Sequence, residues 1–458
     1  MTLSSEGGIT PRIIIHGGAG NIKRGNLDHE AEVTYSNAMR RILQSSNAFL
    51  SRPEATALDA ATYAVSLLEN DPLFNAGRGA VFTRAGTNEL EASVMVSRGK
   101  RKRGVGVMLV RRVKNPILLA KEMLLRGEED DGGGAGAHSQ LCGETIEDLA
   151  REWGCEMVEP EYFYTQKRWD EHIRGLQREK ERNSQSSVER CNGTDFNCNV
   201  LKPVGDPSWD GHEYLPQGTV GCVVLDRWGT LCAATSTGGL TNKLPGRIGD
   251  TPTLGAGFWA EEWTEEHRQV ARSVTQPLYR PQARISPPLR ELQNAPLSFL
   301  RYVIGDCIPG IGLSTYTRLV QNTDGQRSSE NDYLTEKTRF FRVSGKPSRR
   351  AVAMSGTGNG DSFLRVAAVR TAAAICRFSG SGSSLATALA QVAGPGGELQ
   401  QSAGDRWGVT GEGEGGIIGI ELVSGKGKIA MDMNCGGMFR AWVDDEGVAQ
   451  IRVFRDDA

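Results

Sequence analysis

Hydrophobic residues along the first quarter of the chain follow the two periods that mark strands and helices. Residues 12–16 form a short apolar run, typical of a strand, which leads into a glycine turn at residues 17–20. Residues 53–69 predict a helix, with the proline suited to its first turn. The apolar face of that helix would hold Ala57, Leu58, Ala61, Val65 and Leu68. Residues 89–96 and 104–110 predict the two strands of a hairpin.

The pattern changes near the middle of the chain. From residue 167 to about residue 217 the sequence is polar and charged, with few periodic apolar positions, which predicts an exposed, mobile linker. The linker ends abruptly at Gly218-Thr219. Two β-rich runs follow, residues 220–226 and 230–236, separated by a short turn.

The last part of the chain predicts one long helix and several strands. Residues 362–378 are rich in alanine and predict the helix. The predicted strands are residues 416–423, 428–433, 439–443 and 450–454. Residues 261–350 are irregular and hold several prolines, so we expect an insertion there. This order of elements favours helices layered on antiparallel sheets.

Composition narrows the class of protein. The 458 residues carry a formal net charge of −2, so bulk charge gives no reason to expect nucleic acid or an acidic membrane as a partner. The nine cysteines form no CxxC pair, and we expect reduced thiols. Without an apolar signal region or a run of about 18 apolar residues, we expect a cytoplasmic protein with no membrane span. The basic run at residues 100–103 leaves a nuclear address open, but we favour a solvated hairpin tip.

The candidate chemistry begins where the polar segment meets a strand. Thr219 follows a glycine, whose missing Cβ leaves the carbonyl of Gly218 open to attack by the threonine hydroxyl. Cleavage there would leave Thr219 with a free α-amine, of reference pKa about 7.7–8.0, beside its own hydroxyl. That amine can serve as the base that activates the hydroxyl, as in threonine N-terminal nucleophiles.

Three further residues fit around this nucleophile. The second strand of the hairpin would bring Thr237 back beside Thr219, within hydrogen-bonding reach. Arg247 offers a planar fork for a carboxylate, and Asp250 offers a partner for an ammonium. Together they could hold the α-carboxylate and α-amine of an amino acid whose side chain reacts.

With these residues the chain resembles the plant-type asparaginase and isoaspartyl peptidase family. The matching stretches, in order, are His16-Gly17-Gly18-Ala19-Gly20, Pro72-Leu73-Phe74-Asn75-Ala76-Gly77, Gly218-Thr219-Val220-Gly221, Gly246-Arg247-Ile248-Gly249-Asp250 and Thr357-Gly358-Asn359-Gly360-Asp361. The resemblance implies one α+β domain, an αββα four-layer sandwich of the N-terminal-nucleophile hydrolase type. It also implies self-cleavage into an α subunit of residues 1–218 and a β subunit of residues 219–458.

The same resemblance implies a role for individual residues. Thr219 would be the nucleophile and Thr237 its support, while the Thr357 hydroxyl and the Gly358 amide would form the oxyanion hole. Asn75 would buttress the cleavage site between Gly218 and Thr219. The activity implied is hydrolysis of the β-amide of L-asparagine and of β-aspartyl peptides, which yields L-aspartate.

The resemblance also bears on ions and partners. It implies no cofactor for catalysis, but a loop whose main-chain carbonyls hold a structural sodium in relatives. The carbonyls concerned belong to Leu68, Glu69, Asp71, Phe74, Ala76 and Arg78. A dimer of αβ units, acting on a small or peptide substrate with an L-aspartyl group, is implied as well.

Several features depart from the family pattern. Glu91 stands where the family usually has aspartate, and Asp361 stands where it usually has glutamate. We expect Asp361 to cap the helix that follows, and His16 to be structural. The pair Ser355-Gly356 permits a two-residue slip against Thr357-Gly358, and we prefer the latter because it continues without a gap.

Three alternative functions stay open at this point. A taspase-like threonine endopeptidase would cut after aspartate, but Thr235-Ser236-Thr237 is more similar to asparaginases. Glycosylasparaginases usually carry an aspartate before the nucleophile, where this chain has Gly218. A catalytically silent scaffold is the third alternative, with the insertion at residues 261–350 as its interaction surface.

Overall fold

The apolar runs assemble into two β-sheets. The computed structural model describes residues 8–191, 218–265, 348–379 and 383–456. The larger sheet has the strand order β12-β11-β1-β5-β6-β2-β3-β4, and the smaller sheet has the order β10-β9-β8-β7. All neighbours are antiparallel except β3 and β4. The strands are β1 (Arg12–Gly20), β2 (Leu90–Val96), β3 (Gly104–Val110), β4 (Gln140–Cys142), β5 (Val220–Leu225), β6 (Leu231–Thr237), β7 (Phe258–Glu265), β8 (Ser348–Gly358), β9 (Gly415–Val423), β10 (Lys426–Met433), β11 (Gly437–Val443) and β12 (Ala449–Phe454).

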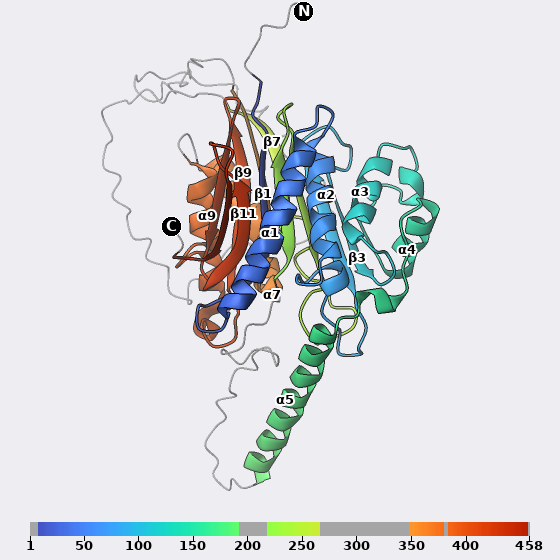
Figure 1. Ribbon diagram of the computed structural model, residues 1–458, viewed down its shortest axis with the longest axis vertical. Helices are drawn as coiled ribbons and strands as arrows, with labels where there is room; N and C mark the ends of the chain where they lie inside the picture. Colours follow the sequence, from blue (N-terminus) through green and yellow to red (C-terminus); the bar gives the residue numbers. More distant parts are fainter. Residues whose placement is uncertain (1–7, 192–217, 266–347, 380–382, 457–458) are drawn as a thin grey trace, which may run out of the picture. The chain divides into compact units, whose positions relative to one another are not determined.

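Helices cover the outer faces of the two sheets. In Figure 1, α1 and α2 lie side by side over the larger sheet, and α9 lies beyond the smaller one. The helices are α1 (His29–Leu50), α2 (Ala57–Asn70), α3 (Pro116–Arg126), α4 (Gly143–Glu152), α5 (Gln166–Cys191), α7 (Gly360–Val366), α8 (Ala368–Phe378), α9 (Leu385–Ala393) and α10 (Glu398–Ala403). None of the helices in these described ranges is long and apolar enough to span a membrane.

Alternation along the strands divides the buried side chains into three apolar clusters. On β1, Ile13 and Ile15 point toward the helices, whereas Ile14 points toward the smaller sheet. The middle cluster joins β5 and β6 to β7, β8 and β9 through residues such as Val223 and Ile418. The third cluster lies between the smaller sheet and α7–α10. Both sheets are therefore buried on two faces, which explains why their strands are apolar at consecutive positions.

Most predicted strands are confirmed, and the helix boundaries move for identifiable reasons. The predicted helix at residues 53–69 begins at Ala57 because the Thr56 side chain caps it, accepting from the Asp59 amide at 3.1 Å. The predicted helix at residues 362–378 is two helices, α7 and α8, divided at Ala367, which has a φ of 45°. The left-handed conformation of Ala367 ends the run of helical hydrogen bonds.

The glycine turn predicted at residues 17–20 is instead the second half of β1. The pairing of β1 with β11 shifts register between His16 and Ala19, which is the signature of a β-bulge. Gly18 has a φ of 121° there, a conformation that side chains disfavour. The glycines therefore bend a continuous strand.

The linker predicted from residue 167 is wrong over its first half, because α5 extends from Gln166 to Cys191. Residues 192–217 of that linker lie outside the described part. Within α5, Gln, Lys, Arg and Glu are abundant and are strong helix formers, so the low hydrophobicity of this segment did not prevent a helix. The few buried positions in its first turns fall at helical spacing and include Arg168, Glu171 and His172.

The insertion predicted at residues 261–350 is bounded more narrowly than the sequence suggested. Residues 261–265 belong to β7 and residues 348–350 belong to β8, and these strands pair from Phe258↔Ser355 to Glu265↔Ser348. Residues 266–347 lie outside the described part. The core sheet therefore continues up to both ends of that segment.

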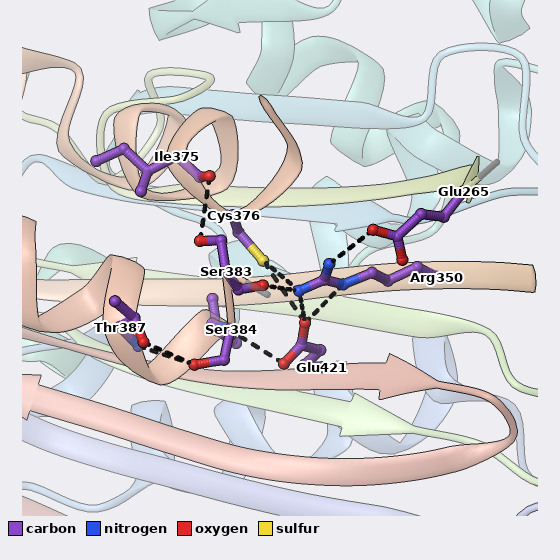
Figure 2. A network of polar contacts seen from close by, with 9 residues as sticks. Glu265, Arg350, Ile375, Cys376, Ser383, Ser384, Thr387 and Glu421 are labelled. Carbon is purple, nitrogen blue, oxygen red and sulfur yellow. Dashed lines mark hydrogen bonds and ion pairs between the residues drawn. The ribbon is translucent and has the colours of Figure 1, made fainter. Parts of the chain in front are cut away.

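A buried ion pair closes the sheet at this point. Figure 2 shows the Arg350 guanidinium between Glu265 of β7 and Glu421 of β9. Arg350 Nε donates to Glu421 Oε1 at 2.8 Å, and the second Glu421 oxygen accepts from the Leu385 amide, at the start of α9, at 3.2 Å. Both charged side chains are less than a tenth exposed. The pair thus ties three strands to the outer helix layer.

We predict that Arg350→Ala lowers the free energy of unfolding by about 3–5 kcal/mol, because it leaves the Glu421 carboxylate buried without its cation. Arg349→Ala is the matched control on the same strand. Its ion pair with Glu262 is about one-third exposed, so its loss should cost at most about 1 kcal/mol. Urea unfolding followed by circular dichroism measures both. Equal losses in the two variants would contradict the assignment.

Candidate active site

The candidate nucleophile lies at the buried start of β5. The strand pairing that joins Val220 to Ser236 places Thr219 opposite Thr237, as the hairpin predicted. The Thr219 side chain is almost fully buried. The preceding residue is crowded by β1: a Cβ on Gly218 would lie 2.2 Å from Gly18 Cα and 2.5 Å from the Ala19 nitrogen. Only glycine fits at this position.

The hydroxyl that contacts Thr219 belongs to a residue that the sequence did not single out. Thr219 Oγ1 lies 3.0 Å from Thr251 Oγ1. Thr237 Oγ1 accepts from the Gly239 amide at 3.0 Å, so its own proton remains available for a second bond. Thr251 follows directly after Asp250, and this adjacency was the only signal in the sequence.

Thr357 and Gly358 end β8 close to the same β1 segment. The Ala19 amide donates to Thr357 Oγ1 at 3.1 Å, which leaves the Thr357 hydroxyl proton free to donate elsewhere. Gly358 has a φ of 145°, and a Cβ there would lie 2.4 Å from the Glu414 carbonyl. Ser355, the alternative in the slipped alignment, already has its hydroxyl 2.7 Å from His16 Nε2.

The Arg247 and Asp250 side chains lie together beside the start of α7. A Cβ on Gly360 would lie 2.5 Å from Asp250 Oδ1 and 3.0 Å from an Arg247 Nη atom. Within the described ranges, Asp250 Oδ2 and Arg247 Nε have no hydrogen-bond partner. Buried polar atoms are normally paired, so these two groups are available for a ligand of complementary charge.

Burial makes Asp250 sensitive to pH. Loss of water around its carboxylate raises the pKa of Asp250 to about 7, with the nearby Glu91 and Asp361 charges adding to the rise. The Arg247 guanidinium opposes this effect without cancelling it. An ammonium bound at Asp250 would favour the ionised carboxylate.

The expected role of Asp361 as a helix cap is wrong. Asn359 caps α7, accepting with its side chain from the Ser362 amide at 3.1 Å. Asp361 lies one position into the helix, and its carboxylate forms an ion pair with Arg247 at 3.2 Å. Although aspartate is shorter than the glutamate usual in the family, Asp361 reaches Arg247 from the first turn of α7.

Two buried glutamates hold the loop that carries Arg247. Glu89 Oε2 accepts from the Gly246 amide at 2.8 Å, and Glu91 Oε1 accepts from the Gly249 amide at 3.1 Å. Lys243 Nζ donates to the Glu89 carbonyl at 2.7 Å and lies close to the Glu91 charge. Burial raises the pKa of Glu91 and lowers that of Lys243. Glu89 and Lys243 were missed because their spacing in the sequence gives no hint of this contact.

His16 lies beneath Thr219 as a neutral side chain. It is fully buried, which lowers the pKa of the imidazole to about 3 despite a hydrogen bond with the Thr219 backbone. A Cβ on Gly221 would collide with both His16 Nε2 and Ser355 Oγ. A histidine that stays neutral at ordinary pH suits the structural role expected for it.

Asn75 links the loop after α2 to the end of β6. Its side-chain Nδ2 donates to the Gly239 carbonyl at 2.8 Å, and its main-chain carbonyl accepts from the Gly238 amide at 2.9 Å. Its Oδ1 accepts from the Val81 amide at 3.0 Å. Asn75 therefore fixes the backbone directly after Thr237.

The candidate sodium loop brings several carbonyl groups into a crowded turn. The carbonyls of Leu68, Asp71 and Ala76 accept amide hydrogen bonds of 3.2–3.3 Å, each with one lone pair to spare. A Cβ on Gly77 would lie 2.4 Å from the Glu69 carbonyl, and one on Gly79 would lie 2.1 Å from the Phe74 carbonyl. Neutral oxygen donors in this number fit a hard cation.

The Glu69 carboxylate belongs to a separate network. It accepts from Ser236 Oγ at 2.7 Å and from the Ile117 amide at 3.0 Å. Burial raises the pKa of this carboxyl group to about 7. Among the described residues, no cluster of three histidine, cysteine or acidic side chains could hold a metal ion.

The cysteines whose side chains the structure describes are free thiols. They are Cys142, Cys155, Cys222, Cys232, Cys376 and Cys435. Cys222, three residues after Thr219, is fully buried, and burial raises the pKa of its thiol. It therefore does not compete with Thr219 as a nucleophile.

The chain is similar to several named enzymes of one family. The chain is 40% identical to the isoaspartyl peptidase of Salmonella typhimurium over 248 residues, which cover 54% of this chain and 69% of the relative. It is 40% identical to the isoaspartyl peptidase of Escherichia coli, over 54% of this chain and 67% of the relative. It is 34% identical to a plant-type L-asparaginase of Pyrobaculum calidifontis, over 54% of this chain and 70% of the relative. The asparaginase family model matches residues 9–265, more than half of the chain, and the chain belongs to that family.

Proposed function

We propose that the chain cleaves itself before Thr219 and then hydrolyses the β-amide of L-asparagine and of β-aspartyl peptides, releasing L-aspartate. The observation that carries this proposal is the pairing of Val220 with Ser236, because this register continued by one residue sets Thr219, directly before β5, opposite Thr237 at the end of β6. The names of the relatives, isoaspartyl peptidase and plant-type L-asparaginase, support the same chemistry.

Self-cleavage needs one intramolecular attack and one water. Thr219 Oγ1 forms a bond to the Gly218 carbonyl carbon, and its proton passes to the Thr219 nitrogen as the peptide bond breaks. Water then hydrolyses the resulting ester, which leaves a carboxylate on Gly218 and a free α-amine and hydroxyl on Thr219. The contact of Thr219 Oγ1 with Thr251 Oγ1, at 3.0 Å, helps to orient the attacking oxygen.

Turnover uses the two groups that cleavage releases. The α-amine takes the proton from Thr219 Oγ1, which attacks the side-chain amide carbon of the substrate. The Thr357 hydroxyl and the Gly358 amide donate to the developing oxyanion, at about 3–4 kcal/mol of barrier lowering for each donor. The leaving nitrogen takes the proton from the α-amine and departs as ammonia or as a peptide amine. Water, with the amine again as base, hydrolyses the β-aspartyl ester.

Substrate selection rests on charge. We assign the substrate α-carboxylate to Arg247 and the α-ammonium to Asp250, because Arg247 Nε and Asp250 Oδ2 are buried without a hydrogen-bond partner among the described residues. Glu89 and Glu91 keep Arg247 in position by holding the amides of Gly246 and Gly249. Glycosylasparaginase and taspase-like activities are not favoured, because the relatives reported above carry isoaspartyl peptidase and asparaginase names.

Three further assignments belong to this proposal. The three apolar clusters fit an αββα sandwich of the N-terminal-nucleophile type. The carbonyl groups of the loop after α2 would hold a structural sodium, which would fix the turn around Asn75. The reaction itself needs no cofactor, and we expect the cleaved protein to be a dimer of αβ units.

We predict that Thr219→Ala stays a single chain and has no amidase activity. The hydroxyl that attacks Gly218 is lost, so the peptide bond stays intact and no free α-amine is released. Thr219→Ser is the matched control, since it keeps the hydroxyl and should still cleave, though more slowly. Denaturing gels and N-terminal sequencing distinguish them. Two chains in Thr219→Ala, or active wild-type protein without a chain that starts Thr219-Val220-Gly221-Cys222, would refute the nucleophile.

We predict that kcat/KM for asparagine rises with pH through about 7, because Asp250 must lose its proton before it can bind the substrate ammonium. In Asp250→Asn the part of the rise that Asp250 causes should disappear, and the remaining rise should follow the Thr219 α-amine, whose reference pKa is about 7.7–8.0. The value of kcat/KM should also fall roughly 10- to 100-fold with the loss of one charge-assisted hydrogen bond.

Succinamic acid, which lacks the α-amine, is the matched substrate for this test. Its kcat/KM should be similar in wild type and Asp250→Asn, and should lack the limb near pH 7 that Asp250 causes. An equal fall for both substrates would show that Asp250 acts on something other than the ammonium.

A further inference from the structure

The first turns of α5 bury charged side chains, which is unusual for a helix that extends away from the sheets (Figure 1). Arg168 is 1% exposed, and Glu171 and His172 on the same face are also buried. Arginine is rarely buried to this degree unless all its donors are engaged. Neither the family motifs nor the proposed mechanism uses this residue.

The Arg168 guanidinium binds one carboxylate and two main-chain carbonyls. Its Nη1 donates to Glu171 Oε2 at 2.9 Å, which balances its charge. Its Nε donates to the Gly79 carbonyl at 2.7 Å, and its Nη2 donates to the Leu73 carbonyl at 3.3 Å. The two carbonyls enclose residues 73–79, the turn that contains Asn75.

This turn is packed so closely that two of its positions admit only glycine. Gly77 has a φ of 51°, and the Phe74 and Glu69 carbonyls lie so close to Gly79 and Gly77 that no Cβ would fit. The Arg168 guanidinium donates to the Leu73 and Gly79 carbonyls at the two ends of this turn, and these charge-assisted bonds fix the turn from outside.

The support reaches the cleavage site through Asn75. The Asn75 side chain and backbone bind Gly239 and Gly238, directly after Thr237. The β5–β6 register pairs Val220 with Ser236, and its continuation by one residue sets Thr237 opposite Thr219. Hydrogen bonds thus lead from the base of α5 to the residues directly after Thr237, and the strand register relates Thr237 to the cleavage site.

The base of α5 also holds the loop that leads to Arg247. The Asn242 side chain donates to the His172 carbonyl at 3.0 Å, and its oxygen bonds to His172 Nδ1. His172 and Asn242 lie on opposite sides of the proposed cut in the sequence. The helix is thereby attached to both segments, which keeps Arg168 in place after cleavage.

We propose that Arg168 is a positioning residue for self-cleavage: its guanidinium is a built-in cation that holds residues 73–79 and, through Asn75, sets Thr237 and Thr219 for attack on Gly218. This proposal rests on the self-cleavage proposed above. It assigns a function to α5 beyond that of a connection.

The test compares Arg168→Ala with Arg168→Lys and a control, Arg84→Ala. Arg84 forms an exposed ion pair with Glu179 on the same helix, so its loss removes a contact to α5 without touching the turn. Precursors made by cell-free synthesis would be followed on denaturing gels. We expect Arg168→Ala to cleave at least ten-fold more slowly than wild type, Arg168→Lys to be intermediate, and Arg84→Ala to match wild type.

Chemical rescue separates positioning from general stability. Ethylguanidinium at millimolar concentration should restore cleavage in Arg168→Ala and leave Arg84→Ala unchanged. In the fraction of Arg168→Ala that has cleaved, kcat per site should fall while KM for asparagine stays near the wild-type value. The reason is that Arg168 acts on the position of Thr219, whereas Arg247 and Asp250 bind the substrate.

The outcomes are distinguishable. If wild type does not cleave, self-cleavage fails and this proposal fails with it. If wild type cleaves and Arg168→Ala matches it, only the assignment of Arg168 is overturned. If Arg168→Ala does not fold, Arg168→Lys decides: cleavage at the wild-type rate with unchanged melting temperature overturns the proposal, and slower cleavage supports it.

Discussion

The contact on which the site depends is the approach of two backbones, at Gly18 of β1 and at Gly218, two residues before β5. A Cβ on Gly218 would lie 2.2 Å from Gly18 Cα, so side chains are excluded from this contact. The bulge in β1 lies at this approach: residues 17 and 18 leave the regular pairing with β11, whereas Ala19 is paired again and donates to Thr357. The proposed cleavage site is therefore held against a bulged strand by a contact that only glycine permits.

Around this contact the protein buries more charge than an ordinary core contains. Asp250, Glu91, Lys243 and Glu69 are all nearly inaccessible to water, and burial shifts the pKa of each toward its neutral form. Asp250, Glu91, Lys243 and the less buried Arg247 form one group of mixed charge. Glu91 and Lys243 bind backbone groups, whereas Asp250 and Arg247 each have an unpaired atom that a substrate could bind. Such groups are costly to assemble, and they cluster where a ligand must be held.

Local patterns in the sequence predicted the strands and the residues that meet at the centre of the site. The hairpin of β5 and β6 follows from alternation and one turn, and its register alone sets Thr219 opposite Thr237. Contacts between distant segments were not accessible in this way: Thr251 at the nucleophile, Glu89 beneath Arg247, and Arg168 at the turn around Asn75 depend on tertiary packing. The helix α5 was missed because a polar composition was taken for disorder, although its residue types favour helix.

The pairing of Glu265 with Ser348 has a consequence for how the length of the chain can change in evolution. Two neighbouring antiparallel strands need only a tight turn between them, and lengthening that connection costs only about 0.6 kcal/mol for each doubling. The connection between β7 and β8 can therefore gain, exchange or lose sequence without disturbing Thr219 and the residues around it. Differences in length among descendants of this chain should concentrate at this connection.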